Sequence, residues 1–215
     1  MIRMHHAYRS QLELPMDQQL EGHDLVAHLL QSEELNRQNE KTAYYLKLAK
    51  LRLPATLEQI ECSPSRNLTK QQLAVLAEGR YLTRGENILI TGATGSGKSY
   101  LACALGHQAC LQGYKTAYLN MNRLIEKVAL FKLDGSYIKL LNYLERQALI
   151  ILDDFGLQPL SQEIRLTILQ LLEDRYGVKS IIITSQLPVA NGMNTSMILR
   201  WLMPYLTGCQ QMRNG

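Results

Sequence analysis

The 215-residue sequence predicts an α/β fold in which a parallel sheet is flanked by helices. From Gly85 onward, short apolar runs alternate with helical segments, which is the pattern of a parallel sheet. The first apolar run leads into a glycine-rich turn, and a later one ends in two adjacent aspartates. We expect strands at 87–91, 115–120, 148–153 and 180–185, and helices at 98–111, 122–131, 136–146 and 161–175.

The glycine-rich turn at residues 92–99 reads G-A-T-G-S-G-K-S and fits the phosphate-binding loop pattern G-x-x-x-x-G-K-S. Its glycines let backbone N–H groups turn toward a polyphosphate, and the following helix adds its positive N-terminal end. We expect Lys98 to reach the β- and γ-phosphates of ATP, and the Ser99 hydroxyl to bind Mg²⁺. A turn that binds nothing is disfavoured, because strand, loop, Lys-Ser pair and helix agree. The residues expected to contact nucleotide are Gly92, Ala93, Thr94, Gly95, Ser96, Gly97, Lys98, Ser99 and Tyr100.

The acid pair follows the apolar run A-L-I-I-L at residues 148–152. In a phosphate-loop ATPase, such a strand supplies the Walker B acids, so we expect Asp153 to hold Mg²⁺ and Asp154 to accept a proton from the attacking water. Adjacent carboxylates raise each other's proton affinity, which suits one of them to act as a base. The alternative is that the pair only caps the following turn.

A further buried strand ends in the polar residues Thr184, Ser185 and Gln186. In ATPases that insert a strand between the loop strand and the Walker B strand, a polar residue at its tip positions the lytic water. The sequence does not choose among the three, and these residues also suit the start of a turn. We name Ser185 as the catalytic candidate, together with Lys98 and Asp154.

The residues before the loop predict a small helical module over 1–84, preceding an ATP-binding core at 85–189. Residues 17–51 carry apolar positions at helical spacing, and a further helix is expected from Lys70 to Glu78 with Gly79 as its end. Residues 41–84 hold eight basic and three acidic residues, a local charge of +5. On charge alone, such a stretch is more often a solvated helical face than a DNA site.

The overall composition sets further bounds. The net charge of +4 does not by itself identify a nucleic-acid-binding protein. The sequence contains no apolar run of about 18 residues and no signal-peptide pattern, so we expect a soluble cytoplasmic protein without a membrane segment. The four cysteines form no C-x-x-C pair, and Cys103 and Cys110 are expected in the core rather than at a metal or redox site.

The combined motifs resemble IstB, the helper ATPase of insertion-sequence transposition. The matching segments are A-K-L-R at 49–52, A-T-L-E-Q-I at 55–60, the phosphate loop, D-G-S-Y at 134–137, L-D-D-F-G-L at 152–157, L-E-D-R-Y-G at 172–177 and T-S-Q-L-P-V at 184–189. This resemblance implies an AAA+ ATPase with a sheet of the inserted-strand type, related to the DnaC helicase loader. It also implies assembly as a homo-oligomer on double-stranded DNA and assistance to a transposase. The 41–84 segment then becomes a DNA contact, to which Lys127 and Lys132 add charge.

After about residue 189 the sequence departs from the IstB pattern W-H-E-Y-I-x-D-P-T-x-A-D-A-I-x-D-R-L. A set of codons that would encode residues 192–209, read one frame away, translates as W-H-E-Y-I-N-D-P-T-V-A-D-A-I-F-D-R-L, so we expect a frameshifted, poorly ordered tail over 190–215. Its expected consequences are a missing C-terminal strand and lid, an unpaired edge on the loop strand, and no arginine to reach a neighbouring subunit's ATP. ATP binding with little cooperative hydrolysis would follow. A DnaC-like helicase loader and a hydrolysis-deficient, nucleotide-dependent DNA-binding module remain as alternatives.

Overall fold

The computed structural model describes residues 2–20, 22–63, 68–157, 160–186 and 210–214. It divides into two compact units, Met1–Tyr44 and Tyr45–Gly215. The first unit contains α1 (Ile2–Leu12), the short helix η1 (Met16–Gln18) and most of α2 (Gly22–Ala49). Residues 45–84, which we expected with the N-terminal module, lie in the same compact unit as the nucleotide-binding core.

The segment before the sheet belongs to the core because its apolar residues are buried there. It forms η2 (Leu57–Gln59), α3 (Lys70–Ala77) and α4 (Arg80–Arg84). A capping box between Thr69 and Gln72 begins α3, and Gly79, at φ 74°, separates α3 from α4, as the sequence predicts. Leu76 and Tyr81 share a buried cluster with residues of the sheet.

Within the described residues, the sheet contains five parallel strands in the order β2-β3-β4-β1-β5. The strands are β1 (Ile88–Gly92), β2 (Thr116–Asn120), β3 (Leu149–Phe155), β4 (Ser180–Ser185) and β5 (Gln210–Asn214). The first four lie within two residues of their predicted positions. β4 lies between the loop strand β1 and the aspartate strand β3, so the predicted inserted-strand arrangement is confirmed.

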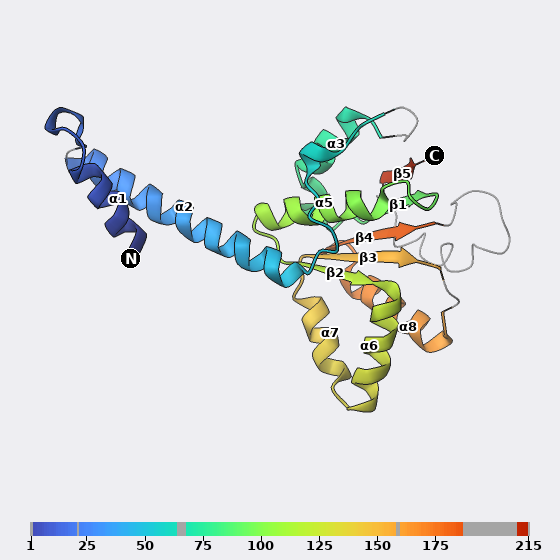
Figure 1. The fold of residues 1–215 in the computed structure, drawn as a ribbon. Coiled ribbons are helices and arrows are strands. Elements are labelled where there is room, and N and C mark those ends of the chain that lie inside the picture. Colours follow the sequence, from blue (N-terminus) through green and yellow to red (C-terminus); the bar gives the residue numbers. More distant parts are fainter. Residues whose placement is uncertain (1, 21, 64–67, 158–159, 187–209, 215) are drawn as a thin grey trace. The chain divides into compact units, whose positions relative to one another are not determined.

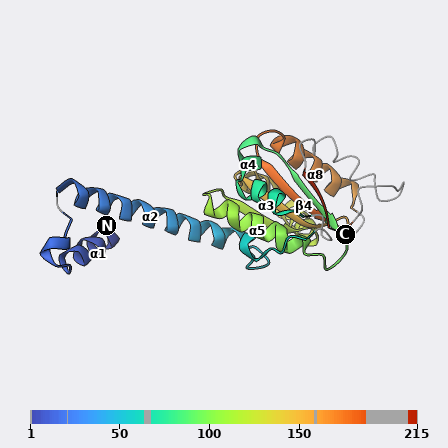
Figure 2. The ribbon, with the colours of Figure 1, turned by 90° about the horizontal axis from the view of Figure 1, so that it is seen from above.

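Helices cover both faces of the sheet (Figure 1). The helix α5 (Lys98–Leu111) lies on one face, and α6 (Met121–Leu133), α7 (Tyr137–Glu145) and α8 (Gln162–Arg175) lie on the other. Alternate residues of each strand enter opposite cores: Ile88 and Ile151 belong to the α5 side, whereas Leu89 and Ile150 belong to the side of α6, α7 and α8. Viewed from above, α3 lies beside α5 (Figure 2).

The prediction that the loop strand β1 has an unpaired outer edge is wrong. Residues 210–214, inside the segment expected to be a poorly ordered tail, form β5, which pairs in parallel with β1 from Ile88 to Gly92. Strand pairing uses backbone N–H and C=O groups, so an extended segment that lacks the family's sequence can still complete the edge. The expectations for the lid and for the remainder of the tail fall on residues 187–209, outside the described residues.

Among the helices that the structure describes, none has the length and apolar character needed to cross a membrane. Because the strands are parallel, the carboxyl ends of β1, β2, β3 and β4 all lie at the same end of the sheet. The phosphate loop and the acid pair follow two of these strands, so both lie at this carboxyl-terminal end.

Candidate nucleotide-binding site

The phosphate loop connects β1 directly to α5. Gly95 and Gly97 have φ values of 81° and 89°, a region that L-residues other than glycine rarely occupy. A Cβ atom at either position would meet no atom within 4 Å, so the backbone conformation, and not crowding, requires glycine there. Gly97 caps α5, and the N–H of Leu101 donates to its carbonyl at 2.9 Å. The loop therefore ends at a helix N-terminus, as an anion-binding loop must.

Lys98 is buried at the first turn of α5, with 6% of its surface exposed. Its Nζ donates to the carbonyl of Ala93 within the same loop at 2.7 Å. Burial lowers the pKa of Lys98, and the charges of Asp154 and Asp153 act in the opposite direction. A cation held under the loop in this way can exchange one carbonyl acceptor for phosphate oxygens.

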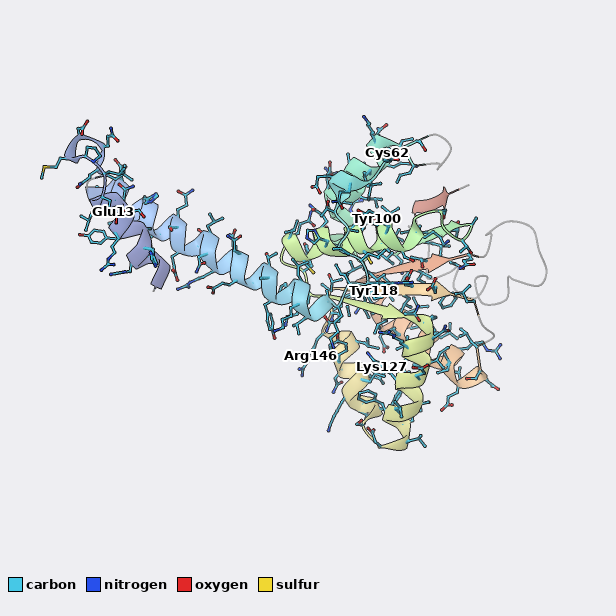
Figure 3. All side chains as sticks on the ribbon, viewed as in Figure 1. Glu13, Cys62, Tyr100, Tyr118, Lys127 and Arg146 are labelled. Carbon is cyan, nitrogen blue, oxygen red and sulfur yellow. The ribbon has the colours of Figure 1, made fainter. Side chains whose placement is uncertain are left out.

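Asp153 is fully buried at the end of β3 and accepts hydrogen bonds on both oxygens. Its Oδ1 accepts from Ser99 Oγ at 2.8 Å and from Thr184 Oγ1 at 2.5 Å. Its Oδ2 accepts from the hydroxyl of Tyr118, a β2 residue labelled in Figure 3. Burial, reinforced by the Asp153 carboxylate, raises the pKa of Tyr118, so this hydroxyl remains a donor.

Ser99 and Asp153 fit a magnesium ion. A hydroxyl and a carboxylate are hard oxygen ligands, and their direct 2.8 Å contact places both at one point beside the loop. Proteins usually hold Mg²⁺ with one or two such side chains, while substrate phosphates and water complete the coordination. The two residues expected from the sequence to bind the metal are thus brought together by the fold.

Asp154 has a different environment from its neighbour. Its backbone adopts φ 61°, within an irregularity of the β3–β4 register between Leu152 and Phe155. Its N–H donates to Thr184 Oγ1 at 3.0 Å, and its Oδ2 accepts from Asn120 Nδ2 at 3.0 Å. Because the left-handed conformation turns this side chain away from the regular pleat, the two adjacent aspartates reach different partners.

The three candidate sensors at the end of β4 have distinct contacts. Thr184 donates to Asp153 and accepts from the N–H of Asp154, so it contacts both members of the acid pair. Ser185 is fully buried, and its Oγ donates to the carbonyl of Phe155 at 3.0 Å. Gln186 Oε1 accepts from Thr94 Oγ1 of the phosphate loop at 2.8 Å. Thr184 is the candidate that contacts both carboxylate residues.

Tyr100, predicted to contact nucleotide, and two arginines of the basic segment, predicted to contact DNA, have partners within the protein. Tyr100 lies on α5 (Figure 3). Its hydroxyl donates to Gln59 Oε1 at 2.5 Å. In the basic segment, Arg80 pairs with Glu78 at 2.8 Å and Arg84 pairs with Glu86 at 3.6 Å.

The two lysines expected to add charge at DNA differ in their contacts. Lys132 pairs with Glu163 at 2.5 Å and lies over the Tyr137 ring. Lys127 lies exposed on α6 (Figure 3). Lys127 is therefore the more available of these two lysines for an external anion.

Three residues at the acid pair were not identified as site residues from the sequence: Arg52, Tyr118 and Asn120. Asn120 ends β2, and the parallel pairing of β2 with β3 places it opposite Asp153. A polar residue at the end of a neighbouring predicted strand is a signal that could have identified it. Arg52 was counted with the basic segment and with the A-K-L-R match at 49–52, and nothing in its local sequence connects it with Asp154, 102 positions later.

The fold and the site define a P-loop nucleotide-binding domain of the AAA+ class. Within that class, the chain belongs to the IstB-like ATP-binding protein family, whose model matches residues 1–195.

Two relatives illustrate the family. A protein of insertion sequence IS1162 from Pseudomonas fluorescens, named for ATP binding, is 38% identical over 94% of this chain and 87% of its own length. An insertion-sequence protein of Sinorhizobium fredii, also named for ATP binding, is 41% identical over 80% of this chain and 71% of its own length.

Solved structures support the fold at lower identity. The DnaC helicase loader superposes with a TM-score of 0.61 at 21% identity, covering 78% of this chain and 100% of its own. The replication initiator DnaA bound to AMPPCP and single-stranded DNA gives a TM-score of 0.65 at 20% identity, covering 77% of this chain and 51% of its own. At these identities the similarity establishes the architecture.

Proposed function

We propose that this chain is an ATP-dependent helper of DNA transposition, which binds Mg·ATP at the phosphate loop, assembles on double-stranded DNA as a homo-oligomer and assists a transposase. The observation that carries the proposal is the 2.8 Å contact between Ser99 Oγ and Asp153 Oδ1. This contact joins the phosphate loop to the acid pair in a chain of the IstB-like family.

The DNA and transposase parts of the proposal are supported by the relatives. Similar proteins are named for insertion sequences and for ATP binding, and the DnaA structure with this fold contains both a nucleotide analogue and single-stranded DNA. A mobile DNA element requires proteins that act on DNA, so a nucleotide-binding protein encoded by one has DNA and the element's transposase as its natural partners.

The site residues have distinct roles in this proposal. Lys98 binds the β- and γ-phosphates, while Ser99 and Asp153 hold the metal. Mg²⁺ bound there would neutralise negative charge on the phosphates. Asp154 accepts the proton of the attacking water, and Thr184 keeps both carboxylate residues in place. We expect turnover to be slow, because the arginine that the family pattern supplies falls in the stretch where this sequence departs from it.

Nucleotide-dependent DNA binding tests the proposal. With Mg·ATP present, the protein should bind a fluorescent DNA duplex and change its anisotropy, and without nucleotide this binding should weaken. Asp153→Asn should weaken Mg-dependent ATP binding by at least about tenfold, because it removes a charged metal ligand, and should weaken DNA binding with it. Asp174→Asn, at an exposed position of α8, serves as the matched control. DNA binding that is indifferent to ATP would contradict the proposal.

The sensor assignment has its own test. Thr184→Val should slow single-turnover ATP hydrolysis by about tenfold or more while ATP affinity changes little, because the acid pair loses the hydroxyl that contacts both of its residues. Thr184→Ser, which retains the hydroxyl, should restore the rate. Thermal unfolding of each variant without nucleotide checks that the fold persists. If Ser185→Ala slows hydrolysis and Thr184→Val does not, Ser185 is the sensor.

A further inference from the structure

Arg52 places a positive charge beside both carboxylates of the acid pair. Its Nη1 lies 3.6 Å from Asp153 Oδ2 and 3.4 Å from Asp154 Oδ2, so one guanidinium nitrogen bridges the two carboxylates. Arg52 lies in the segment between α2 and η2, which we call the connector (residues 50–56). A residue far from the phosphate loop in sequence therefore reaches the acid groups of the site.

The connector is fixed against α5 on both sides of Arg52. Leu51 packs into the core on this face, close enough to Gly106 that a Cβ atom there would lie 3.0 Å from Leu51 Cδ2. Ala55 is 1% exposed and packs with Cys103 and Ala104 of α5. Because the backbone is anchored before and after it, Arg52 reaches the carboxylates from a defined position.

The exposure of the three side chains is unequal. The Arg52 side chain is 55% exposed, whereas those of Asp153 and Asp154 are 0% and 22% exposed. The guanidinium can therefore move into solvent at low cost, while the carboxylates remain where they are. Since Arg52 and a bound Mg²⁺ would both be cations beside Asp153, they repel each other, and each weakens the hold of the other on the acid pair.

We infer that Arg52 is a positioning residue that competes with Mg²⁺ for the acid pair. It holds Asp153 and Asp154 in place when nucleotide is absent, and it leaves them when Mg·ATP binds. Its departure alters the contacts of the connector, which follows directly from α2, so nucleotide binding is coupled to the segment that leads to the N-terminal unit. This inference rests on the proposed Mg·ATP site.

The Mg²⁺ dependence of nucleotide binding tests it. Binding of a fluorescent, non-hydrolysable ATP analogue is measured across a Mg²⁺ titration and again in EDTA. Arg52→Gln should lower the half-saturating Mg²⁺ concentration by about tenfold, because the competing charge is gone while the site's ligands remain. Its affinity in EDTA should match the wild type, because Arg52 contacts the carboxylates and not the phosphates.

Two further variants separate charge from structure. Arg52→Lys retains the cation and should keep the wild-type Mg²⁺ dependence. Arg80→Gln removes the same charge from α4, near the opposite end of the loop strand. This variant should also keep the wild-type Mg²⁺ dependence.

The outcomes distinguish the inference from the proposed function. An unchanged or raised half-saturating Mg²⁺ concentration in Arg52→Gln, with nucleotide binding intact, overturns the role of Arg52 and leaves the proposed function standing. Weaker binding of this variant in EDTA also overturns it, since Arg52 would then act on the nucleotide. A wild-type protein that binds no nucleotide with Mg²⁺ overturns both.

Discussion

Replacing Lys98 by alanine should reduce the affinity for Mg·ATP by on the order of 100-fold, the largest functional effect that we expect from a single substitution. Lys98 is the buried cation of the phosphate loop, and its Nζ lies 2.7 Å from the carbonyl of Ala93. A hydrogen bond between charged groups is typically worth about 1.5–3 kcal/mol, and the phosphates would also lose their nearest positive charge. Isothermal titration with a non-hydrolysable ATP analogue measures the loss.

Lys127→Ala is the matched control for this experiment. Lys127 carries the same side chain and lies exposed on α6, on the other face of the sheet from α5 (Figure 1). The Lys127→Ala variant should retain the wild-type affinity for Mg·ATP, because the ammonium group that it removes lies outside the phosphate loop. If Lys98→Ala also binds ATP normally, the nucleotide does not occupy the loop at 92–99 and the proposed site is wrong.

Replacing Arg175 by alanine should lower the free energy of unfolding by about 3–5 kcal/mol, the largest structural effect expected here. Arg175 is 2% exposed at the end of α8. Its Nη1 donates to the carbonyls of Leu144 and Gln147 at 3.1 and 2.9 Å. Its Nη2 donates to the carbonyls of Ala148 and Ser180 at 3.1 and 3.0 Å. One side chain therefore joins α7, α8 and the starts of β3 and β4.

The substitution leaves these carbonyls without their donor in a space that the side chain no longer fills. Burial lowers the pKa of Arg175 to about 10, so the guanidinium remains protonated at neutral pH and all its contacts are charge-assisted. Urea denaturation measures the change in stability. Arg165→Ala, at an exposed position on the same helix, should change stability little, and an equal loss in both variants would contradict this role of Arg175.

Local sequence predicted most of the core because each signal acts over a few residues. The apolar runs of β1, β2, β3 and β4 are bounded by glycines and polar residues, and the helices between them have clear beginnings and ends. Asn120 and Ser161, for example, cap α6 and α8 with their own side chains. The inserted position of β4 was also predicted, but through the family resemblance and not through periodicity.

The edge of the sheet shows where prediction failed. We expected the loop strand to lose its outer neighbour because the residues after about 189 do not follow the family pattern. Backbone pairing does not require that pattern, and residues 210–214 take the position beside β1. The sequence of side chains was a poor guide here, because the groups that form the pairing are common to nearly every residue.

Local sequence was enough to predict the phosphate loop, the Ser99 hydroxyl and the acid pair, because a loop of given spacing between a strand and a helix has few conformations. The surroundings of the acid pair were decided only by the tertiary structure, because they depend on which chain segments meet at the carboxyl-terminal end of the sheet. Tyr118 and Asn120 come from the neighbouring strand, and Arg52 lies 102 positions before Asp154. Packing of the connector onto α5 brings Arg52 to the carboxylates, and no pattern within a single segment records that contact.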